Sequence, residues 1–271
     1  MGITNMKKKA YGFVIRSEEI ATDIYSMWIE TDLAKDAAPG QFVGLFTSDK
    51  SALLPRPISI CEVSRDKTAL RLVYRIAGEG TRQFSHYQAG RRVALLGVLG
   101  NGFPYEKAEG KHAVLMGGGI GIPPVLELAK KLSGNGKESA PIAQKVSCIV
   151  GYRNSDTFLL EELQQYSDVY VATEDGSLGT KGNVIDALEN NKLNPDIIFS
   201  CGPMPMLRGI KNWAEPRKIE AYISLEERMA CGVGACLGCV CITKEVDHHS
   251  HVNNTRICTD GPVFDSREVM I

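Results

Sequence analysis

Ala113-Val-Leu-Met-Gly-Gly-Gly-Ile-Gly-Ile-Pro-Pro124 is the stretch that decides the fold. Its first four residues predict a buried strand, and the apolar segment 123–132 that starts at Pro123 predicts a helix. Proline suits the first turn of a helix, where no backbone donor is needed. A strand, a Gly-rich turn and a helix in this order favour a nucleotide site, because the glycines let the backbone approach a pyrophosphate at the helix N-terminus. A plain tight turn is the alternative.

The chain after this turn continues to alternate strands and helices. Strands are predicted at 146–150, 169–173, 197–201 and 219–224, and helices at 155–163 (capped by Ser155 and Asp156), 184–189 and 204–213. This alternation predicts βαβ units and a parallel sheet. Cys201-Gly-Pro203 follows one of the strands. Ligands of such sheets bind at the carboxyl ends of strands, so this loop should face the same cleft. A buried thiol at the strand end is the alternative for Cys201.

The chain before this turn consists of short strands. They are predicted at 11–16, 24–30, 41–46, 58–63, 70–76 and 91–96, with a short helix at 81–87. Many short strands separated by turn signals indicate an antiparallel barrel or sandwich. Within them, Arg56 can pair with a phosphate and Ser59 can hydrogen-bond a ring nitrogen.

The cysteines are concentrated near the end of the chain. Five of the eight follow Ala230, in the spacing Cys231-x4-Cys236-x2-Cys239 with Cys258 later. This spacing is that of plant-type [2Fe–2S] ligands. The neighbouring Gly232, Gly234 and Gly238 allow the backbone conformations of such a wrap. A structural zinc and unligated cysteines are the alternatives.

Two further features lie beside these cysteines. Cys241 falls outside the ligand spacing, so we expect it to pack near the cluster. Asp247-His-His-Ser-His251 could bind a metal, but the tip of a polar hairpin is the preferred interpretation.

Composition excludes several classes of protein. The 271 residues include 31 basic and 32 acidic side chains, for a net charge of -1, which argues against a nucleic-acid binder. No apolar run reaches the roughly 18 residues of a membrane span. A single dense group of cysteines points to metal binding in a reducing compartment, so we expect a cytoplasmic protein.

The motifs R-P-x-S, Y-R-x-x-G-x-G-T, G-G-G-I-G-x-P-P and C-G-P-M follow one another along the chain. In this order they resemble the ferredoxin–NADP⁺ reductase-like superfamily. The segments 225–241 and 258–264 look like the electron-transfer subunits of class 1B, NAD-dependent dihydroorotate dehydrogenase. The resemblance implies an antiparallel FAD-binding β-barrel, an α/β parallel-sheet nucleotide-binding domain and a small C-terminal [2Fe–2S] module. We place their boundaries at 8–104, 105–224 and 225–271.

The resemblance assigns roles to the matching residues. Arg56, Pro57, Ile58, Ser59, Val73, Tyr74, Arg75, Gly80 and Thr81 would hold FAD, and Cys231, Cys236, Cys239 and Cys258 would hold the cluster. Gly117, Gly118, Gly119, Gly121, Cys201, Gly202 and Pro203 would bind NAD. Ser59, near flavin N5, and Cys201, beside the nicotinamide, are the predicted catalytic residues.

The resemblance also implies a partner. An FMN-containing dihydroorotate dehydrogenase catalytic subunit, in a heterotetramer with two copies of each chain, would pass electrons through the cluster and FAD to NAD⁺. No dihydroorotate pocket is predicted in this chain, so it should not oxidise dihydroorotate alone. A related FAD and [2Fe–2S] subunit that serves ferredoxin or sulfide and polysulfide metabolism is the alternative. A zinc-containing binding module is the non-enzymatic alternative.

Overall fold

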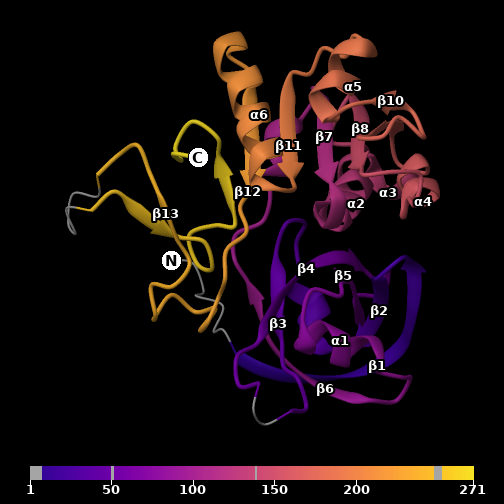
Figure 1. Ribbon diagram of the computed structural model, residues 1–271, viewed down its shortest axis with the longest axis vertical. Helices are drawn as coiled ribbons and strands as arrows, with labels where there is room; N and C mark the ends of the chain where they lie inside the picture. Colours follow the sequence, from indigo (N-terminus) through magenta and orange to yellow (C-terminus); the bar gives the residue numbers. More distant parts are fainter. Residues whose placement is uncertain (1–7, 50–51, 138, 247–251) are drawn as a thin grey trace.

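The chain folds into a barrel, a helix-flanked sheet and a C-terminal part that lies against both (Figure 1). The computed structural model describes residues 8–49, 52–137, 139–246 and 252–271. The predicted hairpin tip Asp247–His251 lies outside them. No helix of the described residues is long and apolar enough to cross a membrane.

The first part is a closed antiparallel barrel, as predicted. Its strands follow the order β1-β2-β5-β4-β3-β6. They are β1 (Lys8–Ala21), β2 (Ile24–Glu30), β3 (Phe42–Leu45), β4 (Arg56–Val63), β5 (Ala69–Arg75) and β6 (Arg92–Leu99), with α1 (Glu79–Ser85) and the 3-10 turn η1 (Asp32–Asp36) between them. In β6, buried and more exposed residues alternate because one face is packed against the barrel core.

Strand β1 is longer than the predicted strand 11–16. It pairs with β2 and β6 and contains irregularities between Val14 and Arg16 and between Glu19 and Ala21. Charged residues in its second half interrupt the apolar pattern, which is why the sequence predicted an earlier end.

The second part is a seven-stranded sheet of order β10-β9-β8-β7-β11-β12-β15, in which all pairs but the last are parallel. Its strands are β7 (His112–Gly118), β8 (Lys145–Tyr152), β9 (Asp168–Thr173), β10 (Thr180–Lys181), β11 (Ile197–Cys201), β12 (Glu220–Ser224) and β15 (Val263–Asp265). Its helices are α2 (Pro123–Leu132), α3 (Gly134–Lys137), α4 (Leu160–Gln164), α5 (Val184–Asn190) and α6 (Met204–Ala214), with 3-10 turns η2 (Tyr105–Ala108), η3 (Gly119–Gly121) and η4 (Glu215–Arg217).

Helices cover both faces of this sheet. Apolar residues of α2 and α4 pack with one face, together with Ile24, Cys61 and Val73 of the barrel. Apolar residues of α5 and α6 pack against the opposite face. Strands buried on both sides explain the short, continuous apolar runs in the sequence.

The helix predicted from Ser155 starts later than expected. Helix α4 begins at Leu160, and Asp156 instead accepts a hydrogen bond from the backbone N–H of Thr22, at 3.2 Å. The capping signal was therefore misread, because the Asp156 side chain is used in a contact between the barrel and the sheet.

The C-terminal part extends the sheet instead of standing apart. Strand β15 pairs antiparallel with β12, with Ile223 opposite Phe264, and a small hairpin of β13 (Val240–Ile242) and β14 (Asn254–Arg256) lies beyond it. Lys211 of α6 is buried and donates hydrogen bonds to the carbonyl oxygens of Ser266 and Val269. One apolar cluster includes residues of all three parts of the molecule: Phe42, Leu99, Leu207, Ile223, Leu225, Cys239, Ile257, Cys258, Phe264 and Val269.

Polar contacts fix the barrel against the sheet and its helices. Arg71 of β5 is 5% exposed, and its guanidinium is hydrogen-bonded to the carboxylate of Glu162 in α4. Beside it, Lys130 of α2 pairs with Glu62 of β4 at 3.0 Å. Because removing one member of a buried ion pair is costly, these pairs favour one relative orientation of the two parts.

Candidate functional site

A cleft of about 1210 Å³ runs along the carboxyl ends of the parallel strands. Its walls come from the barrel, the Gly-rich turn after β7 and the loops after β8, β9, β11 and β12. Arg75 is the residue of β5 that lines the cleft, and Glu226 lines it beyond β12. This is the position at which open α/β sheets bind their ligands.

The Gly-rich turn and the Cys201-Gly-Pro203 loop are packed directly together. Cys201 lies opposite Gly117 in the register of β11 and β7. A Cβ atom on Gly121 would lie 2.3 Å from the carbonyl oxygen of Cys201, and one on Gly118 would lie 2.5 Å from the sulfur of Met206. Gly119 has a φ of +52°, which other residues rarely adopt. These glycines are therefore needed for the close approach of two loops, in addition to any contact with a ligand.

Not every predicted nucleotide residue reaches the cleft. Gly118, Gly119, Gly121, Gly202 and Pro203 line it, whereas Gly117 and Cys201 do not. The Cys201 thiol is 1% exposed, and burial raises its pKa to about 12. Its side chain therefore lies beneath the cleft surface in this structure, and its contact with a nicotinamide stays a prediction.

Arg56 and the start of α1 come together on the barrel, as the predicted flavin site requires. A Cβ atom on Gly80 would lie 2.2 Å from Nε of Arg56, so the arginine fits only against a glycine. Its guanidinium donates to the carbonyl oxygens of Ala52, at 3.2 Å, and Leu54, at 2.5 Å. The Thr81 hydroxyl accepts hydrogen bonds from the N–H groups of Ala77 and Gly78, which closes the turn before the helix.

Strand β5 divides its predicted flavin residues between two faces. Tyr74 points into the barrel, where its ring is 6.0 Å from that of Phe84, and it is 2% exposed. Val73 packs on the opposite side with the core of the sheet, and Arg75 reaches the Gly-rich turn, with Nη2 3.2 Å from where a Cβ of Gly119 would be. Arg75 is thus placed to meet a ligand, whereas the Tyr74 side chain supports the barrel wall.

The predicted residues of β4 show the same division. Ile58 is buried in the barrel core, Pro57 is exposed, and Ser59 is half-buried opposite Phe42 of β3. Ser59 does not line the cleft. Its proximity to a flavin ring therefore stays a prediction.

The four predicted cluster ligands are brought together in two pairs. The thiol of Cys231 interacts with that of Cys236, and the thiol of Cys258 with that of Cys239. The Ile257 N–H donates to the carbonyl oxygen of Cys239 at 2.8 Å, which joins the segments of the second pair. Among the described residues, no group of three or more Cys, His, Asp or Glu side chains is close enough to hold a single metal ion. Two pairs suit a two-iron cluster, in which each iron takes two protein thiolates.

Backbone N–H groups point at the sulfur atoms. Val233 donates to Cys231 and Gly238 donates to Cys236, each at 3.4 Å. Burial opposes ionisation of Cys231, but backbone N–H groups and Cys236 outweigh it and lower the pKa to about 6. Burial and the neighbouring Cys239 raise the pKa of Cys258 to about 11. An environment with this many donors favours sulfur ligands that carry negative charge.

The wrap uses glycine partly as predicted. Gly232 and Gly234 have φ values of +67° and +82°, but at the third position Leu237, at +54°, takes the left-handed conformation, and Gly238 does not. A Cβ on Gly232 would lie 3.2 Å from Leu99, so the wrap sits directly on β6 of the barrel. Cys241 is half-buried near Cys239, and burial raises its pKa to about 11; its role as a packing residue stays a prediction.

Glu226 was missed from the sequence. It lies two residues after the end of β12 and lines the cleft near Arg75. Its position just beyond a buried strand, two residues after the end of β12 as Gly202 is one residue after the end of β11, was the signal that could have found it.

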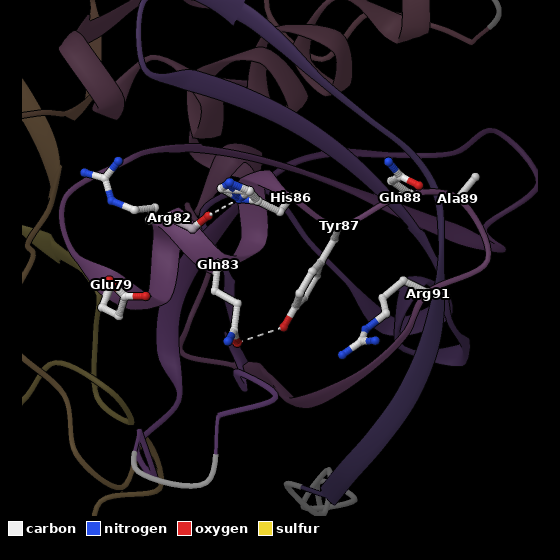
Figure 2. A pocket seen from close by; sticks show the side chains of 8 residues that line it. All are labelled: Glu79, Arg82, Gln83, His86, Tyr87, Gln88, Ala89 and Arg91. Atoms are coloured by element: carbon white, nitrogen blue, oxygen red, sulfur yellow. Dashed lines mark hydrogen bonds between the residues drawn. The ribbon is translucent and has the colours of Figure 1, made fainter.

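A second hollow of about 640 Å³ lies on the barrel beside α1 (Figure 2). It is lined by Glu79, Arg82, Gln83, His86, Tyr87, Gln88, Ala89 and Arg91. Several of these groups bond to each other: Tyr87 donates to Gln83 at 3.1 Å, and His86 contacts the Arg82 carbonyl oxygen at 3.2 Å. The hollow shares no lining residue with the cleft and contains none of the predicted site residues.

The residues present fit the three groups predicted. The thiol pairs with their N–H donors fit a [2Fe–2S] cluster, and the Arg56–Gly80 contact forms a cradle at the start of α1. The glycine-lined cleft is large enough for a dinucleotide.

Comparison with known proteins gives the same assignment for the C-terminal part and for the whole chain. Residues 226–270 match the family model described as the iron–sulfur cluster binding domain of dihydroorotate dehydrogenase B. The chain is 42% identical to the electron transfer subunit of dihydroorotate dehydrogenase B (NAD(+)) of Bacillus mycoides, over 98% of this chain and 100% of the relative. The corresponding subunit of Bacillus velezensis is also 42% identical, over 97% of this chain and 100% of that subunit.

Solved structures agree on the fold. A structure of the NADH-dependent reduced ferredoxin-NADP oxidoreductase superposes with a TM-score of 0.81 at 26% identity, covering 100% of this chain and 91% of that one. Ferredoxin-NADP⁺ reductase from Plasmodium falciparum, at 14% identity and a TM-score of 0.63, covers 80% of this chain and 96% of its own. The second likeness shows the fold alone.

Proposed function

The chain belongs to the family of electron transfer subunits of dihydroorotate dehydrogenase B, and on this premise we propose that it carries electrons from a dihydroorotate-oxidising subunit to NAD⁺. The observation that carries the proposal is that the wrap with the four paired cysteines packs against β6 of the barrel, while residues of the same barrel, among them Arg75 of β5, line the glycine-rich cleft. The iron–sulfur, flavin and nicotinamide sites would thus lie in one chain in the order that the electrons require.

The order follows from what each group can exchange. A cluster exchanges single electrons, a nicotinamide exchanges hydrides, and a flavin exchanges both, so the flavin must lie between the other two. The protein supplies position and charge. Arg56, with the start of α1, would bind the phosphates of FAD, and Ser59 and Arg75 would lie beside its ring. Val73, whose side chain is buried in the core of the sheet, would contact FAD only through its backbone.

The nicotinamide dinucleotide would occupy the cleft. Gly118, Gly119 and Gly121 would approach its pyrophosphate, while Gly202 and Pro203 would place the nicotinamide end. Because the Cys201 thiol is buried, it would act on the nicotinamide from beneath the backbone of Gly202. Cys231 and Cys236 would hold one iron of the cluster, and Cys239 and Cys258 the other.

The partner would be a catalytic subunit that carries FMN and oxidises dihydroorotate, with two copies of each chain in the assembly. The curated relatives are named as electron transfer subunits, which supports a separate catalytic chain. The grouping of reduced cysteines supports a cytoplasmic location.

The face that meets this partner would be the exposed apolar surface around the cluster. Val233, Leu237, Val240 and Ile242 belong to the cluster wrap and β13 and are between 37% and 62% exposed. Several large exposed apolar side chains in one segment are typical of an interaction site. Docking here would place the partner next to the thiol pairs.

Replacing Ile242, which is 52% exposed, by lysine should weaken the complex with the catalytic subunit roughly 10- to 100-fold. A charge would have to be buried in an apolar contact, while the isolated chain should keep its flavin and cluster. Titration calorimetry with the catalytic subunit measures the change. Leu178→Lys, at an exposed position in the loop before β10, is the matched control and should bind normally. Equal affinities of both variants and the unmodified chain would place the interface elsewhere.

The function is tested with the reconstituted chain, alone and with its catalytic partner. Alone, it should show flavin and iron–sulfur absorbance and should reduce dyes with NADH, without oxidising dihydroorotate. Together with the FMN subunit, it should reduce NAD⁺ with dihydroorotate. A colourless reconstituted chain, or a coloured complex that leaves NAD⁺ unchanged, would refute the proposal.

A second candidate is a related subunit that exchanges electrons with ferredoxin. It is favoured by the likeness to the NADH-dependent reduced ferredoxin-NADP oxidoreductase structure, which covers the whole of this chain. Supplying reduced ferredoxin in place of dihydroorotate, in the same NAD⁺ assay, distinguishes the two. The 42% identity to the dihydroorotate dehydrogenase subunits makes dihydroorotate the first choice.

A further inference from the structure

Hydride exchange in the proposed electron path takes place across the boundary between two parts of the molecule. The proposed flavin residues belong to the barrel, whereas the glycines that would hold the nicotinamide dinucleotide belong to the sheet. One hydrogen and two electrons move together, in the balance NADH + FAD giving NAD⁺ + FADH⁻. Because a misplacement of about 1 Å can slow such a step roughly 100-fold, contacts that fix the two parts relative to each other bear directly on its rate.

An irregularity in β4 turns one charged side chain toward this boundary. The register of β4 against β5 shifts between Ile60 and Glu62, as in a β-bulge. Ile60 and Val63 pack in the barrel core, whereas Cys61 packs with the core of the sheet. Strict alternation from Ile60 would direct Glu62 into the barrel core. The extra residue instead places Glu62 on the same outer side as Cys61, which is a common use of a bulge.

Glu62 joins two cations through its two carboxylate oxygens. Its Oε1 accepts a hydrogen bond from Nζ of Lys130 in α2, at 3.0 Å, and its Oε2 lies 3.4 Å from Nη1 of Arg71 in β5. The three side chains are between 6% and 19% exposed, so water competes little for these contacts. Arg71 is in turn bonded to Glu162 of α4. Glu62 is therefore the central member of a row of alternating charges that crosses from the barrel to two helices of the sheet.

The strand and the helix that this row connects both reach the cleft. Arg71 and Arg75 lie on one face of β5, about 13 Å apart, and Arg75 lines the cleft. Helix α2 lies at the boundary next to the barrel (Figure 1). It starts at Pro123, just after the Gly-rich turn, and Lys130 lies about 10 Å further along its axis. Since both elements are stiff over such lengths, a contact at their far ends controls the spacing at the cleft.

We propose that Glu62 is a positioning residue for hydride exchange, a role that rests on the proposed function. Its carboxylate holds Lys130 and Arg71 together and so sets the distance between a nicotinamide in the cleft and a flavin on the barrel. Glu62 does not line the cleft, so it acts through the placement of the two parts. Loss of this link should slow hydride exchange but leave NADH affinity unchanged, because the glycines of the cleft belong to the sheet alone.

Glu62→Gln breaks the link with little change in size. Glutamine has one oxygen and one NH₂ group, so it can accept from only one of the two cations and presents donors to the other. Lys130→Met removes the opposite end of the same link, and Lys130→Arg restores a cation there. Asp168→Asn is the matched control, because it breaks the 3.2 Å pair of Asp168 with Lys145, which joins the first residues of β9 and β8 within the sheet.

Stopped-flow reduction of the flavin by NADH, in the reconstituted full chain, measures the hydride step. At saturating NADH, Glu62→Gln and Lys130→Met should each be roughly tenfold slower, with a dissociation constant for NADH within about twofold of the unmodified value. The double variant should be no slower than either single variant, since both remove the same link. Lys130→Arg and Asp168→Asn should keep most of the rate. Flavin and cluster absorbance establish that each variant is loaded.

Two further readouts report placement without turnover. The long-wavelength charge-transfer absorbance of NAD⁺ with the reduced flavin requires the two rings to lie face to face, so it should weaken in Glu62→Gln and Lys130→Met. The Val63 N–H donates to the Glu127 carboxylate of α2 at 3.0 Å, so its protection from hydrogen exchange depends on the contact between β4 and α2. Exchange of the peptide that contains Val63 should accelerate in these two variants and not in Asp168→Asn.

The inference is overturned if Glu62→Gln reduces its flavin at the unmodified rate, or is slow only because it binds NADH more weakly. Unchanged exchange at Val63 in that variant would also overturn it. If NADH does not reduce the flavin of the unmodified chain, the proposed function fails instead. Hydrogen exchange at Val63 then still decides whether Glu62 ties the barrel to the sheet.

Discussion

Cys239→Ser should abolish the iron–sulfur signal and reduce dihydroorotate-dependent NAD⁺ reduction at least 100-fold, because the cluster is the group proposed to pass electrons between the subunits. Cys239 is 2% exposed and paired with Cys258. A serine hydroxyl is a poor substitute for the soft thiolate that iron–sulfur clusters require. The barrel and the cleft are built from other residues, so NADH-dependent dye reduction through the flavin should continue.

Cys241→Ser is the matched control for this experiment. Cys241 lies two residues further on, beside Cys239, but outside the two thiol pairs. Absorbance and electron paramagnetic resonance of the reduced chain report the cluster directly. A cluster that survives in Cys239→Ser, or one that disappears in Cys241→Ser, would mean that the ligand set is assigned wrongly.

Gly121→Ala should have the second-largest effect, with a loss of stability of about 1–3 kcal/mol and at least tenfold weaker use of NADH. The added Cβ would lie 2.3 Å from the carbonyl oxygen of Cys201 and 2.6 Å from the nitrogen of Gly202. These are backbone atoms at the end of β11, so the clash is relieved only by separating the two loops that form the cleft floor.

Gly209→Ala tests whether the effect is specific to this contact. Gly209 also lines the cleft, but it lies within α6, and its Cβ would be 4.0 Å from Ile185. Alanine in a helix is more stable than glycine by roughly 0.5–1 kcal/mol, so this variant should unfold at a slightly higher temperature. Thermal denaturation and the KM for NADH measure both variants. Similar values for Gly121→Ala and the unmodified chain would show that the loops are not in contact in solution.

Local patterns predicted most of the elements, because each strand and helix has its own apolar periodicity. The barrel strands, the parallel strands and helices α2, α5 and α6 follow such runs. The proposed boundaries at 104/105 and 224/225 stay predictions. What the sequence could not indicate depends on contacts between distant segments, such as the use of Asp156 by Thr22 or the pairing of β15 with β12.

The candidate site shows the same limit. The cysteine spacing indicated the thiols that the structure brings together in two pairs, because a short wrap fixes their neighbourhood in the chain itself, while their ligation of a cluster stays a prediction. Motif order identified Arg56 and Gly80, which do meet. It did not distinguish Tyr74, directed into the barrel, from Arg75, directed into the cleft, since successive residues of a strand face opposite sides and the sequence does not say which side is which.

Pairing of β15 with β12 has a consequence for synthesis of the chain. When β12 leaves the ribosome, its neighbour β11 has already been made and can pair with one of its edges. The other edge of β12 has no partner until Val263–Asp265 has also left the ribosome. An unpaired sheet edge can recruit strands of other molecules. A nascent chain, or one that stops before Val263, would therefore expose this edge of β12 and be more prone to aggregate.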